Sequence, residues 1–194
     1  GGKGELRSKT RVFEGNVTIP SPHVYTENQF PETLNWNYDG SSCYQAEGED
    51  SEITLKPKAC YKNPWGGPNN YLFICDTYRP DGTPTESNTR NAAAKVFSKN
   101  AVSLKPRFGI EHEFFVIDNS TGYPLGYSPE GTESQGKYYC GVGAGRAIGR
   151  NFLSKGLHLA NKAGVKVTGS NFEVAPGQME IQVCNYGIRA GDDS

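Results

Sequence analysis

The stretch NFEVAPGQMEIQV, residues 171–183, predicts a β-hairpin with a glutamate on each arm. Residues 167–174 and 179–183 are rich in β-branched and apolar side chains, which is typical of strands. The APGQ segment between them favours a turn, because its proline fixes one φ angle and its glycine can adopt a positive one. A four-residue loop of this kind places Glu173 opposite Glu180. Two carboxylates directly opposed across an antiparallel pair destabilise it by about 0.2–1 kcal/mol, so the pattern requires a compensating interaction.

A second pair of acids lies in FGIEHEFFVID, residues 108–118. On a strand, Glu111 and Glu113 point to the same face, about 6.6 Å apart along the backbone. His112 shares the opposite, apolar face and is interpreted as a hydrogen-bonded core histidine rather than a ligand. Two alternate glutamates by themselves are more typical of a solvated strand. Together with the hairpin, they place four glutamates on strands of one predicted domain.

Such a cluster can be relieved in two ways. A crowded carboxylate can take up a proton because its pKa is raised, or a cation can bind between the carboxylates. Oxygen ligands of this kind suit hard ions such as Mg²⁺, Mn²⁺ or Ca²⁺ rather than zinc. Mg²⁺ held by few carboxylates usually completes its coordination with water and phosphate oxygens. We therefore expect a divalent ion at this site, with a nucleotide as its natural partner.

The composition indicates a globular chain with much loop and β-turn structure, since its 194 residues include 24 glycines and 12 prolines. The net charge is −1 and the basic residues are scattered, which argues against nucleic acid or a membrane surface as a partner. The five cysteines form no CxxC pair and suit a reducing compartment, so we expect a cytoplasmic location. The chain begins with glycine and stops soon after the predicted hairpin, and we expect it to be part of a longer polypeptide.

The order of predicted elements favours an α+β fold. Further strands are predicted over residues 5–19, 51–64, 70–78 and 107–118, and helices over residues 89–97 and 145–164. Ser87 or Asn88 is expected to cap the first helix. We expect a mostly β domain over residues 1–85 and the start of an α+β domain over residues 86–194. The glycine-rich GVGAGR segment lacks the last glycine of a dinucleotide-binding fingerprint and is interpreted as a turn that leads into the second helix.

Several motifs in this order resemble glutamine synthetase of the eukaryotic type, also called type II. They are GELRSKTR, WNYDGSS, QAEGEDSEITLKPKACYKNP, FGIEHEF, YYCGVGAGRAIGR and NFEVAPGQMEIQV, and the resemblance extends over practically the whole chain. It implies a fragment that covers most of an N-terminal β-grasp domain and the first part of a catalytic domain, whose antiparallel sheet carries the metal-binding glutamates. The implied reaction joins ammonia to glutamate at the expense of ATP, through a γ-glutamyl phosphate intermediate.

The resemblance also implies roles for the acidic residues. Glu113, Glu173 and Glu180 match positions that hold one divalent ion, Mg²⁺ or Mn²⁺. Glu111 matches a position that helps to hold a second ion near the ATP phosphates, and Glu180 also borders the nucleotide site. A metal between Glu173 and Glu180 would offset the repulsion that the hairpin pattern creates.

A second group of residues matches the family's ammonium site. Asp39, followed by Ser42, matches a loop that reaches into the active site of a neighbouring subunit, where the aspartate and a tyrosine matching Tyr139 bind ammonium and help to deprotonate it. The resemblance implies active sites between subunits of a homo-oligomer, a decamer of two stacked pentameric rings.

Two departures from the family pattern leave other functions open. Met179 stands where the family usually has tryptophan, and the segment after Gln182 is one residue shorter than usual and borders the nucleotide in the family. A non-catalytic structural relative, or a ligase that joins glutamate to another amine, are the alternatives. Asp39 and Ser42 argue against the second alternative, because those groups serve the ammonium site.

Overall fold

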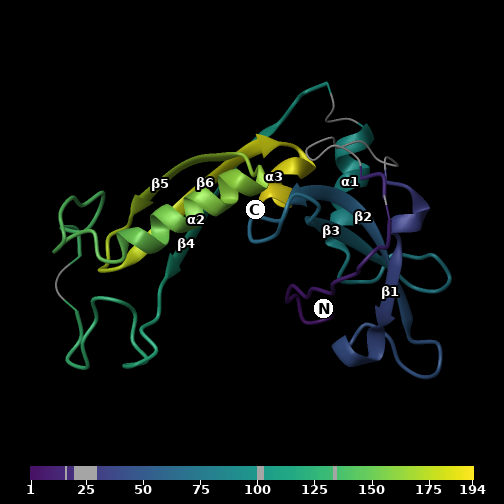
Figure 1. The fold of residues 1–194 in the computed structure, drawn as a ribbon, viewed down its shortest axis with the longest axis horizontal. Coiled ribbons are helices and arrows are strands. Elements are labelled where there is room, and N and C mark those ends of the chain that lie inside the picture. Colours follow the sequence, from purple (N-terminus) through teal and green to yellow (C-terminus); the bar gives the residue numbers. More distant parts are fainter. Residues whose placement is uncertain (16, 20–29, 100–102, 133–134) are drawn as a thin grey trace. The chain divides into compact units, whose positions relative to one another are not determined.

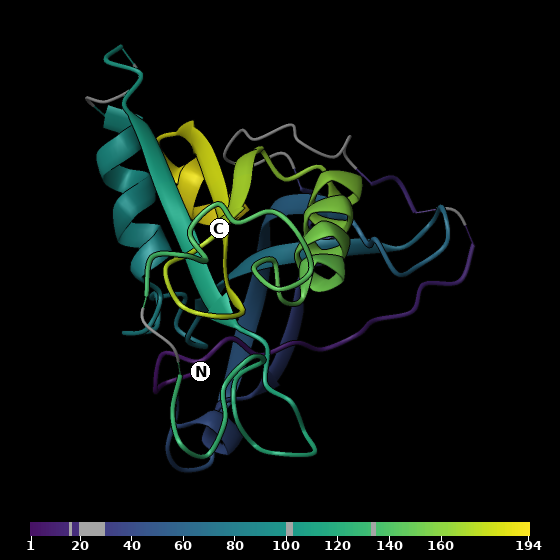
Figure 2. The ribbon, with the colours of Figure 1, turned by 90° about the vertical axis from the view of Figure 1, so that its left-hand side faces the viewer.

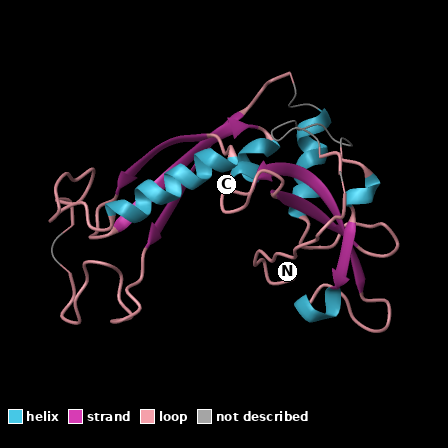
Figure 3. Cartoon of the chain, in the orientation of Figure 1, coloured by secondary structure: helices cyan, strands magenta, loops and turns pink. Residues whose placement is uncertain are grey.

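The computed structural model describes residues 1–15, 17–19, 30–99, 103–132 and 135–194. These residues form two compact units, Gly1–Lys105 and Pro106–Ser194, and each unit is described by itself. Both units combine helices with an antiparallel sheet, so the fold is mixed α and β as predicted. Figure 3 distinguishes the helices and strands from the extensive loops. Within the described residues, no helix has the length and apolar character needed to cross a membrane.

The first unit contains a three-stranded antiparallel sheet of order β1-β2-β3 (Figure 1). Its elements are η1 (Glu32–Leu34), β1 (Trp36–Asp39), η2 (Gly40–Cys43), β2 (Glu52–Lys62), β3 (Tyr71–Tyr78) and α1 (Thr89–Lys99). The strands predicted over residues 51–64 and 70–78 are thereby confirmed as β2 and β3.

Helix α1 begins with a side-chain cap. The backbone N–H of Asn91 donates a hydrogen bond of 3.1 Å to Oδ1 of Asn88, so Asn88 rather than Ser87 caps the helix. The Asn88 amide also donates to the carbonyl oxygen of Thr77 in β3, at 3.0 Å. These contacts attach α1 to the first unit, which ends at Lys105.

The strand predicted over residues 5–19 is wrong, because residues 5–15 and 17–19 contain no strand. Two of its cationic side chains bind backbone carbonyls, whereas Arg7 forms an ion pair with Glu5. Lys9 Nζ donates to the carbonyl oxygen of Asn37 in β1, at 2.8 Å. Arg11 Nη1 donates to the carbonyl of Asn35 just before that strand, at 2.9 Å.

The second unit contains an antiparallel sheet of order β4-β6-β5. Its elements are β4 (Arg107–Phe115), α2 (Arg150–Ala163), β5 (Val167–Phe172), β6 (Gln178–Tyr186) and α3 (Ile188–Asp193). The helix predicted over residues 145–164 is observed as α2, but it begins only at Arg150. It ends as predicted at Gly164, whose φ of 95° is accessible to glycine. The short helix α3 was not predicted.

Helix α2 lies against β5 and β6 and covers one face of this sheet (Figure 1). The core beneath it is built from apolar side chains of the helix, of the segment just before it and of the strands. These are Ala147, Leu153, Phe172 and Met179, with Phe114, Val116 and Ile181 packed against them. Because side chains alternate along a strand, the intervening residues point to the other face. Figure 2 shows the unit from the side, with the loops between β4 and α2 beyond the end of β4.

The hairpin register differs from the prediction by two residues. Strand β6 begins at Gln178, and Asn171 rather than Glu173 lies opposite Glu180. Glu173 instead donates its backbone N–H to the carbonyl oxygen of Gln178, at 2.9 Å. The cause is the turn, in which the Gln178 N–H closes on the carbonyl of Ala175 at 3.2 Å and draws Gln178 into the ladder. A shift of two residues leaves every side chain on its predicted face.

Candidate functional site

The acidic cluster lies on the sheet face that α2 leaves uncovered. Glu113 on β4 is directly opposite Glu180 on β6, and Glu111 is opposite Gln182. One carboxylate oxygen from each of Glu111, Glu113 and Glu180 lies within 4.8 Å of the others. The predicted pairing of Glu173 with Glu180 is therefore wrong, and the acid directly opposite Glu180 is Glu113 on β4.

Glu180 and its two partners differ in solvent exposure. The Glu180 side chain is only 4% exposed, whereas Glu111 and Glu113 are exposed. A buried carboxylate normally needs a cationic partner or several hydrogen bonds. Among the described residues, no lysine, arginine or histidine forms an ion pair with any of these glutamates.

Glu173 joins the cluster from the end of β5. The Asn171 side-chain amide donates to Glu173 Oε1 at 3.0 Å and to Glu180 Oε2 at 3.4 Å, so the two carboxylates share one donor. Loss of hydration raises the pKa of Glu173, and its contact with Glu180 and the charge of Glu113 act in the same direction. The structure thus gathers Glu111, Glu113 and Glu180 in one group, and it links Glu173 to that group through the Asn171 amide.

Neutral amide side chains hold these carboxylates. Gln178 Nε2 donates to Glu113 Oε2 at 2.7 Å, and Gln182 Nε2 donates to Glu180 Oε1 at 2.5 Å. These amides were not predicted from the sequence, although a signal was present, since Gln178 and Gln182 alternate with Glu180 along one face of β6.

The cluster fits a hard divalent cation. Such ions take carboxylate oxygens at about 2.0–2.6 Å, so oxygens up to about 4–5 Å apart can bind the same ion. The oxygens of Glu111, Glu113 and Glu180 meet that condition. Loss of hydration is the main cause of the raised pKa of Glu173, and the contact with Glu180 and the charge of Glu113 add to it, a contribution that a bound cation would offset.

Tyr139 lies within electrostatic reach of this cluster. Its loop is attached to β5, since the backbone N–H of Cys140 donates to the carbonyl oxygen of Phe172 at 3.0 Å. The ring is 55% exposed. The charge of Cys140 raises the pKa of Tyr139 most, and the charges of Glu173 and Glu180 raise it further. The hydroxyl therefore stays protonated at neutral pH.

Asp39 and Ser42 lie in the first unit, at the end of β1 and in η2. Asp39 Oδ1 accepts hydrogen bonds from the backbone N–H and the hydroxyl of Ser41, at 2.9 and 2.7 Å, and Oδ2 accepts one from the Ser42 hydroxyl at 3.4 Å. These bonds lower the pKa of Asp39, the Ser41 hydroxyl contributing most. The exposed carboxylate is therefore fully ionised at neutral pH.

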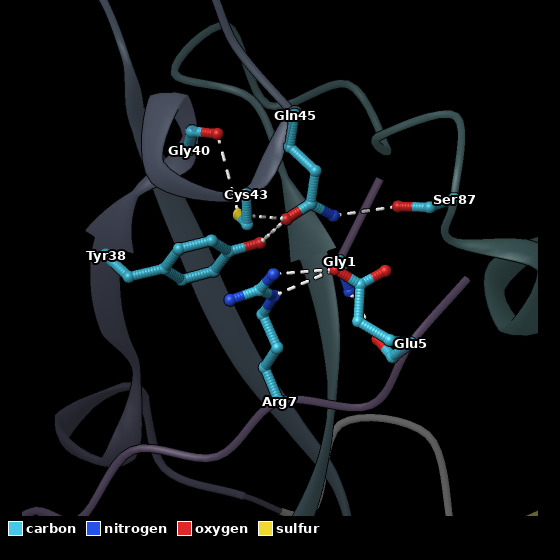
Figure 4. A network of polar contacts seen from close by, with 8 residues as sticks. All are labelled: Gly1, Glu5, Arg7, Tyr38, Gly40, Cys43, Gln45 and Ser87. Carbon is cyan, nitrogen blue, oxygen red and sulfur yellow. Dashed lines mark hydrogen bonds and ion pairs between the residues drawn. The ribbon is translucent and has the colours of Figure 1, made fainter. Parts of the chain in front are cut away.

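A polar network anchors the turn that carries Asp39 (Figure 4). The Gln45 side-chain oxygen accepts hydrogen bonds from the Tyr38 hydroxyl and, at 3.0 Å, from the Cys43 thiol. The Gln45 amide donates to the Ser87 hydroxyl at 2.7 Å. Burial raises the pKa of Tyr38 to about 12, so its hydroxyl keeps the proton that it donates. The network fixes both ends of the turn without using Asp39 itself.

His112 does not match its expected role as a hydrogen-bonded core residue. It lies on the opposite face of β4 from the glutamates, but its buried Nε2 has no hydrogen-bond partner among the described residues. The expectation of a satisfied histidine is therefore wrong for that nitrogen.

An antiparallel sheet that gathers carboxylates around a space suited to a hard cation is compatible with the class of metal-dependent enzymes. The comparison with known families is more specific, because residues 86–193 match the family model described as glutamine synthetase, catalytic domain. Since this match covers more than half of the 194 residues, the chain belongs to the glutamine synthetase family. The resemblance carried by the sequence motifs is confirmed.

Relatives from plants match the chain along its whole length. A cytosolic isozyme of glutamine synthetase from Medicago sativa is 45% identical over 197 residues, which cover 100% of this chain and 52% of the relative. A nodule isozyme from Lupinus angustifolius is also 45% identical, with 100% and 59% covered. A chloroplastic glutamine synthetase from Oryza sativa subsp. japonica is 45% identical over 196 residues, with 99% and 44% covered. The chain thus spans about half the length of the curated relatives it matches.

Proposed function

We propose that the protein to which this chain contributes is a glutamate–ammonia ligase. It forms glutamine from glutamate and ammonia and converts ATP to ADP and phosphate, with γ-glutamyl phosphate as the intermediate. Membership of the glutamine synthetase family supports this reaction. The structural observation that carries it is the convergence of three glutamate oxygens within 4.8 Å, in a site to which the described residues contribute no cationic side chain.

In this proposal the four glutamates hold Mg²⁺ or Mn²⁺. Glu113, Glu173 and Glu180 hold one ion, while Glu111 helps to hold a second ion beside the ATP phosphates, where Glu180 also borders the nucleotide. Bound metal supplies charge neutralisation on the phosphoryl group that passes from ATP to the side-chain carboxylate of glutamate. The glutamates themselves fix where that charge is placed, because their amide partners restrict the carboxylates to one orientation.

The first unit contributes the ammonium-binding group. Asp39, which Ser42 helps to keep ionised, offers a full negative charge to an ammonium cation and can accept one of its protons. Tyr139 provides a protonated hydroxyl within electrostatic reach of Glu173 and Glu180. We place Asp39 in the active site of a neighbouring subunit, in a decamer of two pentameric rings, with residues 1–85 as part of a β-grasp domain and residues 86–194 as the start of the catalytic domain. A cytosolic location also stays a prediction, since the relatives include cytosolic and chloroplastic enzymes.

The decisive experiment is an activity assay on the complete gene product. Glutamate, ATP and Mg²⁺ are supplied, and glutamine and phosphate are measured with ammonium, with methylamine or with no amine. We expect glutamine only with ammonium, and complete loss of product when a chelator removes the metal. Product with methylamine but not ammonium would favour the alternative amine ligase. Mn²⁺ binding without any product would favour the non-catalytic relative.

A further inference from the structure

Two amide side chains beside the glutamates are linked to each other as well as to the acids. Gln182 on β6 donates from Nε2 to Asn171 Oδ1 on β5, at 2.7 Å, and the same nitrogen donates to Glu180 Oε1 at 2.5 Å. The function proposed above uses Gln182 only as a hydrogen-bond partner of Glu180 and gives Asn171 no role. Both contact carboxylates without being able to bind a cation through the nitrogen that makes the contact.

The link fixes which way the Asn171 amide points. Because its oxygen accepts a hydrogen bond from Gln182, its NH₂ group must face the carboxylates. From that position it donates to Glu173 Oε1 at 3.0 Å and to Glu180 Oε2 at 3.4 Å. Reversing the amide would bring its oxygen against two carboxylates and break the bond to Gln182. The hydrogen-bond pattern therefore permits one orientation only.

Both oxygens of Glu180 are held as a result. Gln182 binds Oε1 and Asn171 binds Oε2, and the side chain is only 4% exposed. A carboxylate offers about four lone-pair directions, so each oxygen retains one for a further ligand. Glu180 is thus oriented before any cation arrives.

A glycine leaves the space that this arrangement needs. Gly169 on β5 lies opposite Gln182, and a Cβ atom placed on it would meet Gln182 Oε1 at 2.2 Å. The next nearest atom is Cδ of the same side chain, at 3.4 Å. An alanine here would therefore displace the far end of Gln182 without pressing on the backbone.

We propose that Asn171 and Gln182, in the space left by Gly169, are positioning residues that orient Glu180 and Glu173 for a divalent cation. This inference rests on the proposed metal-binding function of the acidic cluster. Hydrogen-bonding partners of metal ligands typically contribute about 10–100-fold to metal affinity. The hydrogen bonds from the amides also offset part of the repulsion between the carboxylates, which stabilises the cluster in the absence of metal.

The test is a titration of the complete gene product with Mn²⁺ alone, in which the electron paramagnetic resonance signal of free Mn²⁺ gives the dissociation constant. Gln182→Met and Asn171→Leu remove the donors while keeping similar side-chain volumes, and we expect each to weaken Mn²⁺ binding about 10–100-fold. Asn91→Leu is the matched control, because Asn91 is a partly buried amide that donates to the Tyr78 hydroxyl instead of to a glutamate. Its affinity for Mn²⁺ is expected to equal that of the unsubstituted chain. Melting curves recorded without metal distinguish the two roles. A structural role lowers Tm and leaves the Mn²⁺ affinity unchanged, whereas a positioning role weakens Mn²⁺ binding.

Gly169→Ala gives an independent check that removes no polar group. We expect the single variant Gly169→Ala to bind Mn²⁺ more weakly. Combined with Gln182→Met it should cause no additional loss of affinity, because both substitutions act through the same side chain. Unchanged Mn²⁺ affinities in Gln182→Met and Asn171→Leu would overturn the positioning role but not the metal site. The same conclusion would follow if Gly169→Ala weakened binding by its full amount in the Gln182→Met background. Absence of Mn²⁺ binding to the unsubstituted complete gene product would overturn the metal site and the positioning role together.

Discussion

Asp76 in the first unit and Glu180 in the second are both buried carboxylates, 1% and 4% exposed, but they are satisfied in different ways. Asp76 Oδ1 pairs with Arg90 Nη1 at 3.4 Å, and its other oxygen accepts a hydrogen bond from the Tyr78 hydroxyl at 3.3 Å. Glu180 contacts amides and lies opposite another glutamate. Among the described residues it has no ion pair.

This contrast separates a structural acid from a functional one. The chain neutralises Asp76 with its own arginine, so that site is complete and its contribution is to the stability of the first unit. At Glu180 the described residues concentrate negative charge and supply neutral donors, an arrangement that favours a cation as an additional ligand. Burial of a carboxylate by itself would not have distinguished the two.

Glu180→Ala should have the strongest effect. In the complete gene product this change should abolish Mg²⁺-dependent glutamine formation. It should also weaken Mn²⁺ binding by more than the loss of about 10–100-fold that is typical of outer hydrogen-bonding partners. The fold should persist, because the substitution removes repulsion together with a ligand. Calorimetry measures the affinity and circular dichroism the fold. Glu130→Ala is the control, because this exposed glutamate accepts a hydrogen bond from the Ser128 hydroxyl and is not part of the acidic cluster. Unchanged metal affinity in Glu180→Ala would contradict the interpretation of the cluster as a metal site.

Subunit complementation tests whether the two regions serve one active site. Asp39→Ala and Glu180→Ala proteins should each be nearly inactive, since one lacks the ammonium-binding acid and the other the metal ligand. Unfolding and reassembling them together at equal amounts should restore roughly a quarter of the activity, the share of ring interfaces that join an intact Asp39 to an intact Glu180. Mixed assemblies no more active than the sum of their parents would exclude a site shared between subunits.

Arg90→Met should break the structural pair in the first unit. It leaves Asp76 buried without its cation, and we expect the free energy of unfolding to fall by about 3–5 kcal/mol. Both tryptophans of the chain, Trp36 and Trp65, belong to this unit, so urea unfolding followed by tryptophan fluorescence measures it directly. The double variant Asp76→Leu with Arg90→Met removes both charges and should be clearly more stable than Arg90→Met alone. A small loss in Arg90→Met would mean that Asp76 needs no internal cation and would remove the contrast with Glu180.

The weakest effects concern proton binding in the metal-free chain. The pKa of Asp39 lies below its ordinary value, so its contribution to stability is present above that ordinary value and is lost as the pH falls through the lowered pKa. The pKa of Glu173 lies above its ordinary value, so its contribution is present below that value and is lost as the pH rises through the raised pKa. Carbon-detected NMR titration of the two carboxyl groups checks both directions.

Addition of Mg²⁺ should separate the two groups further. The pKa of Glu173 is expected to fall because the ion favours the carboxylate form, while that of Asp39 stays constant. Asp118 is a suitable reference, since hydrogen bonds from Ser120 lower its pKa in the same way in an exposed turn. A Glu173 titration that is insensitive to Mg²⁺ would place this residue outside the metal site.

The elements whose pattern is local follow from the sequence alone. The alternation of side chains along a strand is a property of the backbone, so the positions of Glu111 and Glu113 in the chain suffice to assign both to one face. The apolar stripe of α2 and its glycine stop were equally predictable, as was the cap of α1 within one residue. For the same reason the four glutamates remained on a common face although the predicted hairpin register was wrong by two residues.

Which side chains meet across strands depends on the tertiary fold. The pairing of β4 with β6 joins residues far apart in the sequence, and it alone makes Glu113, rather than Glu173, the direct neighbour of Glu180. The pairing of β5 with β6 brings Asn171 and Gln182 onto the carboxylates and leaves Gly169 beneath Gln182. Residues 5–15 and 17–19 have an alternating pattern but form no strand. Instead of a backbone ladder, Lys9 and Arg11 donate side-chain hydrogen bonds to carbonyl oxygens in and just before β1. Local patterns fix the face on which a residue lies, whereas its partners depend on contacts that no short segment contains.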